Sequence, residues 1–354
     1  MTQLFRTLLL LPLLLLAAVG SARDLDKWER TSFNGIEYVK MDDVCRFYGF
    51  RATQGKAGRV SYGSANRVIS VRPMRQDFYV NDYRYILSYP VQNHSGHLYI
   101  STIDMRKLVD PVLRPKCSPT DKITTVVLDP GHGGHDAGAV SPYAREKDCN
   151  LALAMKVRDL LRKAGFKVVM TRQNDTFLTL GERVAIANRT PNSIFVSIHH
   201  NSSRNSASSG IETFTLAPHG TTSPFARTRR TEELSGNMQD SDNIALATAV
   251  HSAAIKNTAA FDRGIQRARF SVLCTIKRPA ILFEGGFVNN PQEGSKIASS
   301  SYQNILAQSI CNGIIRYCTT TKGSPFAPLR PSTPAPQRGS GIRASGVGRV
   351  LAPR

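Results

Sequence analysis

The feature that most constrains the fold of this chain is a run of apolar and β-branched residues at positions 123–128. Such a run is typical of a strand covered on both faces of a sheet, and Asp129, Pro130 and Gly131 end it. His132 follows at once, so we expect it just beyond the carboxyl end of the strand. That edge is where open α/β sheets bind their ligands.

Three more side chains follow the same pattern at the ends of predicted elements. Glu146 directly precedes a predicted helix, and His199 ends a second buried strand. With His132 they form a three-ligand set that leaves one coordination position of a zinc ion open. Glu284 ends a third apolar strand, where a carboxylate suits the role of general base. The sequence therefore predicts a single Zn²⁺ ion and metal-assisted hydrolysis.

Several short motifs occur in an order that resembles one known enzyme family. They are DPGHGG at 129–134, EK at 146–147 with NL at 150–151, TR at 171–172, AN at 187–188, SIH at 197–199 and EGGF at 284–287. Together they resemble the zinc-dependent N-acetylmuramoyl-L-alanine amidases of the Amidase_3 family, over residues 124–317. The resemblance implies that peptidoglycan is the substrate and that the amide joining N-acetylmuramic acid to L-alanine is cut, in wall remodelling or daughter-cell separation.

Two alternatives to this function remain open at the level of sequence. One is another zinc-dependent wall hydrolase, a peptidase or a sugar deacetylase. The other is a non-catalytic wall-binding protein, which would lack a metal ligand or the base. All four candidate residues are present, so the sequence favours an enzyme.

Residues beside the four candidates invite supporting roles. Asp136 suits a carboxylate that orients His132, although a backbone role in the turn is an equal alternative. His200 follows His199 in a strand, so its side chain should point to the opposite face and bind no metal. Cys149 is expected on the buried side of the helix that follows Glu146, and Asn188 is expected to tie a loop.

Two arginines have two interpretations each. Arg172 and Arg183 are candidates for binding the carboxylates of the substrate peptide. The alternative, which we favour slightly, is structural pairing with Asp175 or Glu182.

The chain is expected to have two units. Residues 123–318 alternate strands and helices, which predicts an α/β catalytic domain with a central, twisted, mostly parallel sheet flanked by helices. Residues 24–115 predict a small strand-rich α+β module that is similar to the copper amine oxidase N-terminal-like domain. That resemblance implies no copper, and it suggests wall association, spacing or a purely structural role. Residues 116–122 are the predicted linker between the two units.

The two ends of the chain have unusual compositions. Residues 1–22 have the basic, apolar and small-residue parts of a secretory signal peptide, and the apolar run is too short for a membrane anchor. We therefore expect export to the periplasm, cell wall or extracellular space. Residues 319–354 are rich in Pro, Ser and Arg and predict a basic, disordered tail. Any activator protein, and the preferred peptide stem, are left open.

The net charge of the chain is +20, which favours anionic partners. After export these are wall polymers, peptide carboxylates or lipid headgroups, and the basic tail is one candidate for contacting them. Nucleic acid is not expected, because no nucleic-acid-binding module is recognisable. The chain has six cysteines, whose pairing cannot be derived from their spacing. Cys311 and Cys318 lie two turns apart on one predicted helix, so we expect no bond between them.

A polar segment at 217–243 interrupts the catalytic unit. A loop of this length inside a compact domain is often a lid or a binding loop. We favour a wall of the substrate groove over an autoinhibitory plug, and both alternatives stay open.

Overall fold

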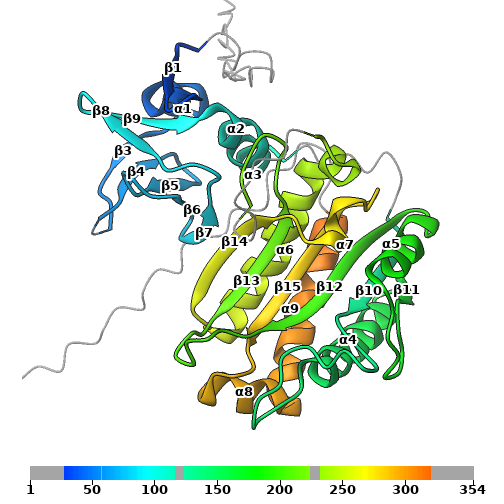
Figure 1. Cartoon of the computed structure of the whole chain (residues 1–354). Helices are drawn as coiled ribbons and strands as arrows, with labels where there is room; N and C mark the ends of the chain where they lie inside the picture. The colour runs from blue at the N-terminus through cyan, green and yellow to red at the C-terminus, as the bar shows by residue number, and fades with distance from the viewer. Residues whose placement is uncertain (1–27, 57, 116–122, 224–231, 320–354) are drawn as a thin grey trace, which may run out of the picture.

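The computed structural model describes residues 28–56, 58–115, 123–223 and 232–319 (Figure 1). The predicted signal peptide, the predicted linker and all but the first residue of the predicted basic tail lie outside these residues. Within the described part of the chain, every helix is too short or too polar to cross a membrane.

The catalytic unit is built on a mostly parallel sheet, as predicted. Its strands, in spatial order, are β11 (Lys167–Met170), β10 (Thr125–Pro130), β12 (Ser193–Asn201), β15 (Ala280–Phe287), β13 (Ile211–Leu216) and β14 (Asp262–Ala268). All neighbouring pairs run parallel except β13 and β15. The carboxyl ends of β10, β12 and β15 therefore meet at one edge, which is where the sequence predicted the site.

Helices cover both faces of this sheet. One face carries α4 (Glu146–Lys163), α6 (Asp240–Thr258) and α9 (Ser300–Thr319), and α6 and α9 cross behind β13 and β15 in Figure 1. The crossing is close because of Gly313, where a Cβ atom would lie 2.6 Å from the Cα atom of Val250. The short helix α8 (Pro291–Ala298) links β15 to α9.

The opposite face is covered only in part. Its helices are α5 (Leu180–Arg189), α7 (Ser271–Cys274) and the 3₁₀ helix η3 (Ser235–Gln239). They enclose a second apolar cluster with Phe195, Phe214 and Leu282 of the sheet. Because side chains alternate along a strand, residues two or four positions away from these three point to the same face.

The N-terminal unit is strand-rich, as predicted. A small sheet consists of β1 (Arg30–Phe33), β2 (Ile36–Lys40), β9 (His97–Ser101) and β8 (Gln92–His94). A second set of antiparallel strands comprises β3 (Arg51–Thr53), β4 (Val60–Gly63), β5 (Val68–Val71), β6 (Asp77–Val80) and β7 (Tyr83–Ile86). The helical parts are α1 (Met41–Tyr48), α2 (Thr102–Asp104), the π-helix η2 (Met105–Val109) and α3 (Asp110–Leu113). Gly49 ends α1 in the left-handed conformation that a glycine adopts at little cost.

The two units share one sheet, which the sequence did not predict. Strand β7 pairs in parallel with β14, with Tyr85 beside Ile265, so β3 to β7 extend the catalytic sheet to eleven strands. Figure 1 shows the N-terminal unit, in blue and cyan, along the β14 edge. The pairing covers an edge that would otherwise expose its backbone hydrogen-bonding groups.

Side chains reinforce the junction between the units. The buried Tyr85 hydroxyl contacts the Thr248 hydroxyl of α6 at 3.2 Å. Asp104 forms an ion pair with Arg267 of β14, and both side chains are almost fully buried. A buried pair of this kind depends on both partners, because either charge alone would be left without compensation.

We expect the substitution Asp104→Ala to lower the free energy of unfolding by about 3 kcal/mol, because it leaves Arg267 charged and buried. Urea unfolding measures this, followed by the fluorescence of Trp28, the one tryptophan, and by circular dichroism of the whole chain. The two probes should report one transition, since the units share a sheet. Asp42→Ala is the matched control, because Asp42 pairs with His97 on the surface. An equally small effect of both substitutions would contradict the interpretation.

Candidate active site

A row of polar side chains crosses the partly open face of the sheet. His199 of β12 is the register partner of Glu284 of β15, which is the partner of Glu212 of β13. All three point to the α5 side, because they lie two or four positions from Phe195, Leu282 and Phe214. Residues from three separate segments thus line up where the face is not covered by α5 or α7.

His132, Glu146 and His199 converge beside this row. One possible ligand atom from each residue lies within 4.8 Å of the others. The Glu146 Oε1 atom lies 3.1 Å from His132 Nε2 and 2.8 Å from His199 Nδ1. Two imidazole nitrogens and a carboxylate oxygen at this spacing fit three ligands of one tetrahedral zinc ion, with the fourth position left for water or substrate.

Neighbouring groups orient these ligands. Asp136 Oδ2 lies 2.8 Å from His132 Nδ1, the ring nitrogen that faces away from Glu146, so Asp136 lies where the orienting role requires. The Ala139 backbone N–H donates to Glu146 Oε2 at 2.9 Å. Asn150 Nδ2 donates to Glu146 Oε1 at 3.2 Å.

The electrostatics of the cluster favour an ionised Glu146. Burial alone would raise the pKa of this carboxyl group, but hydrogen bonds to His132 and His199 outweigh burial and lower it. For His132, burial acts in the direction of a lower pKa, and the contacts with Glu146 and Asp136 raise it overall. An ionised carboxylate between two imidazoles is the form that binds a cation.

Glu284 differs from Glu146 in its surroundings. Its Oε2 atom is buried and has no hydrogen-bond partner among the described residues. Burial, followed by the negative charges of Glu146 and Glu212, raises the pKa of Glu284 well above its usual value. An unpaired carboxylate oxygen with a raised pKa is suited to taking up and releasing a proton.

The two arginines are part of the buried framework. Arg183 Nη1 donates to Asp129 Oδ1 at 2.7 Å, and its Nη2 donates to the His132 carbonyl at 2.8 Å. Arg172 Nη2 donates to the Gly131 carbonyl at 2.8 Å, and both arginine residues are 3% exposed. The turn that carries His132 is therefore held in place by hydrogen bonds from two buried guanidinium groups.

The structure supports the structural role favoured for the arginines, but the partners predicted for that role are wrong. Asp175 pairs with Lys147 at 2.6 Å, and Glu182 caps α5 through Thr179. Because the nitrogens of Arg172 and Arg183 are engaged by oxygens of the protein itself, the structure gives no support to the prediction that they bind substrate carboxylates.

The predictions for the adjacent residues hold. His200 points to the opposite face, where its Nδ1 atom lies 2.8 Å from Asn150 Oδ1, and burial lowers the pKa of His200 to about 4. Cys149 is buried on α4, and burial raises the pKa of its thiol to about 11. Asn188 ties two backbone groups of the 275–277 loop. Cys311 and Cys318 form no bond with each other.

Asn150 is the residue whose role the sequence analysis missed. It contacts Glu146, His200 and the Gly131 carbonyl, so it connects the cluster of candidate ligands to the buried side of the sheet. The available signal was its position four residues after Glu146, since residues i and i+4 share a face of a helix.

Two glycines leave the space that the cluster needs. A Cβ atom at Gly131 would lie 2.1 Å from the His199 ring. At Gly138, which has a φ of +63°, a Cβ atom would lie 2.6 Å from Glu146 Oε2. His132 itself has a φ of 60°, a left-handed conformation that is uncommon for residues other than glycine. The turn is held in this conformation by the arginine contacts to its carbonyl groups.

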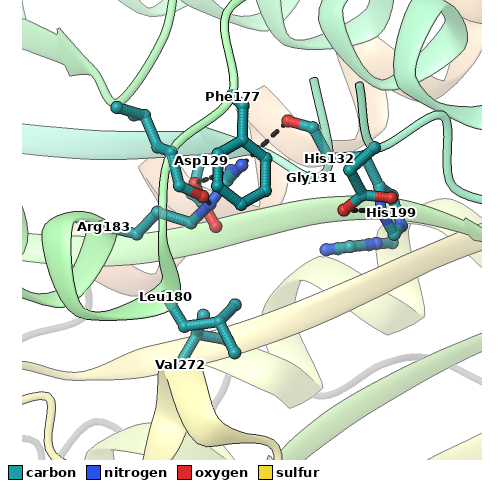
Figure 2. Close-up of a pocket in the computed structure, with 10 residues that line it drawn as sticks. Asp129, Gly131, His132, Phe177, Leu180, Arg183, His199 and Val272 are labelled. Carbon is teal, nitrogen blue, oxygen red and sulfur yellow. Dashed lines mark hydrogen bonds and ion pairs between the residues drawn. The ribbon is translucent and has the colours of Figure 1, made fainter. Parts of the chain in front are cut away.

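A pocket of about 300 Å³ opens beside the cluster. Figure 2 shows His132 and His199 at one end and Leu180 and Val272 at the other. Its lining residues are Asp129, Gly131, His132, Asp136, Phe177, Leu178, Leu180, Arg183, His199 and Val272. The end away from the cluster is therefore apolar.

The polar segment 217–243 begins at the end of the sheet that lies away from Glu284. Arg269 Nη2 donates to the carbonyls of Pro218 and Thr221 at 2.6 and 2.8 Å. Since β13 runs antiparallel to β15, its last residue Leu216 lies toward the start of β15, away from Glu284. Residues 224–231 lie outside the described part of the chain, so the groove wall and the plug both stay predictions.

Comparison with known proteins is consistent with this geometry. Residues 126–316 match the family described as N-acetylmuramoyl-L-alanine amidase. The chain is 36% identical over 193 residues to the uncharacterised protein YqiI of Bacillus subtilis, covering 54% of this chain and 84% of that protein. It is 33% identical over 229 residues to the N-acetylmuramoyl-L-alanine amidase AmiA of Salmonella typhimurium, covering 58% and 79%.

A solved structure is similar over the same part of the chain. It is the catalytic domain of CwlV, an N-acetylmuramoyl-L-alanine amidase from Bacillus (Paenibacillus) polymyxa var. colistinus, with 36% identity and a TM-score of 0.47. The similarity covers 55% of this chain and 97% of that one. The family match begins at residue 126, so the strand-rich N-terminal unit lies outside it.

We expect Gly131→Ala to weaken zinc binding about 100-fold, because the new methyl group would displace the His199 ring. Calorimetric titration of the metal-free protein with zinc measures the affinity. Gly181→Ala is the matched control, since a Cβ atom at Gly181 meets no atom within 4 Å. Equal zinc affinity of the two variants would contradict the assignment of the site.

Proposed function

This chain belongs to the Amidase_3 family of N-acetylmuramoyl-L-alanine amidases, and from that premise we propose that His132, Glu146 and His199 hold a zinc ion beside Glu284 as general base. The reaction is hydrolysis of the amide bond between N-acetylmuramic acid and L-alanine in peptidoglycan. The observation that carries the proposal is the convergence of three ligand atoms from distant segments within 4.8 Å.

The donor set fits zinc, since two imidazoles and one carboxylate are a common ligand set of catalytic zinc sites. Zinc held there would polarise the carbonyl of the scissile amide and lower the pKa of a water molecule toward about 7. Asp136, Ala139 and Asn150 keep the ligands in position through hydrogen bonds to His132 and Glu146.

Glu284 carries the proton in this proposal. Its unpaired Oε2 atom accepts a proton from the water that attacks the carbonyl carbon. As the carbon–nitrogen bond breaks, Glu284 returns that proton to the nitrogen of L-alanine. The stem peptide leaves as a free amine, and the lactyl group stays on the sugar as a carboxylic acid, which then ionises to water. The raised pKa of Glu284 supports both transfers, because a more basic carboxylate accepts a proton more readily and can then return it as an acid.

Two alternatives are less well supported. A non-catalytic wall-binding protein would lack a ligand or the base, whereas all four residues lie at one edge of the sheet. A peptidase or sugar deacetylase shares the same zinc chemistry, and the products of digestion distinguish it from an amidase.

The setting of the reaction belongs to the same proposal. Residues 1–22 direct export, and the enzyme acts in the periplasm or cell wall during wall remodelling or daughter-cell separation. The basic tail at 319–354 contacts an anionic wall or membrane surface by charge. The shared sheet supports a structural role of the N-terminal unit alongside any wall association, whereas its resemblance to the copper amine oxidase N-terminal-like domain rests on the sequence.

We expect purified sacculi to release free stem peptides and intact acetylated glycan strands when they are digested by the protein. A chelator should abolish release, and added zinc should restore it. Mass spectrometry of the soluble products is the measurement. Cleavage between amino acids, or loss of acetyl groups, would contradict the proposed bond, and digestion unchanged by the chelator would contradict the metal.

We expect Glu284→Gln to lower kcat at least 1,000-fold, roughly the loss that removal of a principal acid–base group causes, while zinc binding persists. The measurements are hydrolysis of a muramoyl peptide and zinc titration of the same sample. Glu37→Gln provides a control, since Glu37 forms only a surface pair with Arg30 in the N-terminal unit. Retention of full activity by Glu284→Gln would remove this residue from the mechanism.

A further inference from the structure

The row of polar residues ends at a β-bulge that brings an arginine to the site. Along β13 and β14, Ile211 is the partner of Asp262 and Glu212 is the partner of Gly264, so Arg263 is an extra residue without a partner. A bulge re-aims the side chain of the extra residue. Arg263 Nε accordingly donates to Glu212 Oε2 at 3.3 Å, on the face that also carries Glu284.

The Arg263 side chain is held in place but keeps donors available. Its Nη1 atom donates to the Ser209 carbonyl at 3.4 Å, and its guanidinium carbon lies 4.8 Å from the centre of the Phe287 ring. The side chain is 33% exposed, and Nη2 donates to none of the described residues. The terminal part of the guanidinium group is therefore an oriented cation that an anion can reach.

The N-terminal unit fixes this bulge. The Arg84 backbone N–H donates to Asp262 Oδ2 at 3.0 Å, and Arg84 Nη1 donates to the Arg263 carbonyl at 3.5 Å. Gly264 has a φ of +96°, and a Cβ atom there would lie 3.1 Å from the Arg84 carbonyl oxygen. The extension of the sheet thus holds the backbone from which Arg263 projects.

The opposite flank of the metal cluster has a different character. Phe177, Leu180 and Val272 line its pocket, and the cation of that lining, Arg183, is engaged by oxygens of the protein. A charged peptide group would lose hydration there without gaining a partner, and that loss costs far more for an isolated charge than for an uncharged sugar. The charge pattern therefore directs the peptide side of the substrate over β13 and β14.

The reach of the peptide agrees with this direction. Neighbouring strands are about 4.8 Å apart, so β13 lies roughly 10 Å from β12, which carries the ligand His199. An extended peptide advances about 3.5 Å per residue. A carboxylate that lies two or three residues beyond the scissile amide therefore comes within reach of Arg263, which hydrogen-bonds to Glu212.

We propose that Arg263 is the residue that selects an acidic stem peptide, by binding the free α-carboxylate of the residue that follows L-alanine. The inference rests on the proposed amidase reaction and adds to it the side of the groove that the peptide occupies. It assigns to Arg263 the contact with substrate carboxylate that the sequence suggested for Arg172 and Arg183.

The test uses two muramoyl tripeptides, L-alanyl-γ-D-glutamyl-L-lysine with a free α-carboxyl group on glutamate and the same compound with an α-carboxamide. We expect the zinc-loaded full chain to cleave the acid about tenfold more efficiently in kcat/KM, as for a hydrogen bond to a charged group. Arg263→Gln should cleave both at similar rates, near the rate of the wild-type protein on the carboxamide. Arg263→Lys should keep part of the preference.

The ratio of the two rates does not depend on how much of a variant is folded, so a destabilised Arg263→Gln still gives a clear answer. Arg189→Gln is the matched control at an exposed arginine of α5, and it should keep the wild-type ratio. A ratio near one in the wild-type protein, or an unchanged ratio in Arg263→Gln, would overturn the inference. If the wild-type protein left the muramoyl–alanine bond of both compounds intact, the proposed function would fail as well, which is a different result.

Discussion

The ion pair between Arg183 and Asp129 is the interaction on which the site depends most. Both side chains are almost fully buried, at 3% and 1% exposed, and the same guanidinium group donates to the carbonyls of Pro130 and His132. Thr171 and Ser197 complete the hydrogen bonds of the Asp129 carboxylate. A buried pair with satisfied hydrogen bonds is costly to break, so the turn is rigid. That rigidity keeps His132 in a left-handed conformation, in which its ring faces Glu146.

The sheet supplies the second constraint, because its register fixes distances between residues that are far apart in the chain. His199, Glu284 and Glu212 are consecutive partners across three strands, and Gly264 continues the row on β14. Their spacing is set by backbone hydrogen bonds and not by flexible side chains. The row also explains why the N-terminal unit matters to the site, since β7 covers the edge strand from which Arg263 projects. The N-terminal unit looks separable in the sequence, but it is thereby part of the scaffold that positions this row of polar residues.

Much of the site could be predicted from the sequence because each candidate ligand follows an apolar run or begins a helix. The strands around Val127, Phe195 and Leu282 are buried on both faces, so their composition marks them, and the polar residue that ends each run must lie at the sheet edge. The pairing of β7 with β14 could not be predicted, since edge pairing leaves no periodic signal in either strand. The partner of Arg183 was missed for a related reason, because Asp129 is 54 residues away and only the folded sheet brings the two together.

The three arginines around the site show why residue type alone does not assign a substrate contact. Arg172 and Arg183 lie beneath the turn that carries His132. Burial there makes an unpaired donor costly, so their N–H groups donate to protein oxygens. Arg263 projects from a bulge into partly open space, with one nitrogen on Glu212 and another on Ser209. The two environments differ in solvent access and in the number of acceptors that the protein itself provides. A cation whose acceptors are all internal stabilises the fold, whereas one that is anchored by part of its donors and open at the rest can discriminate among charged substrates.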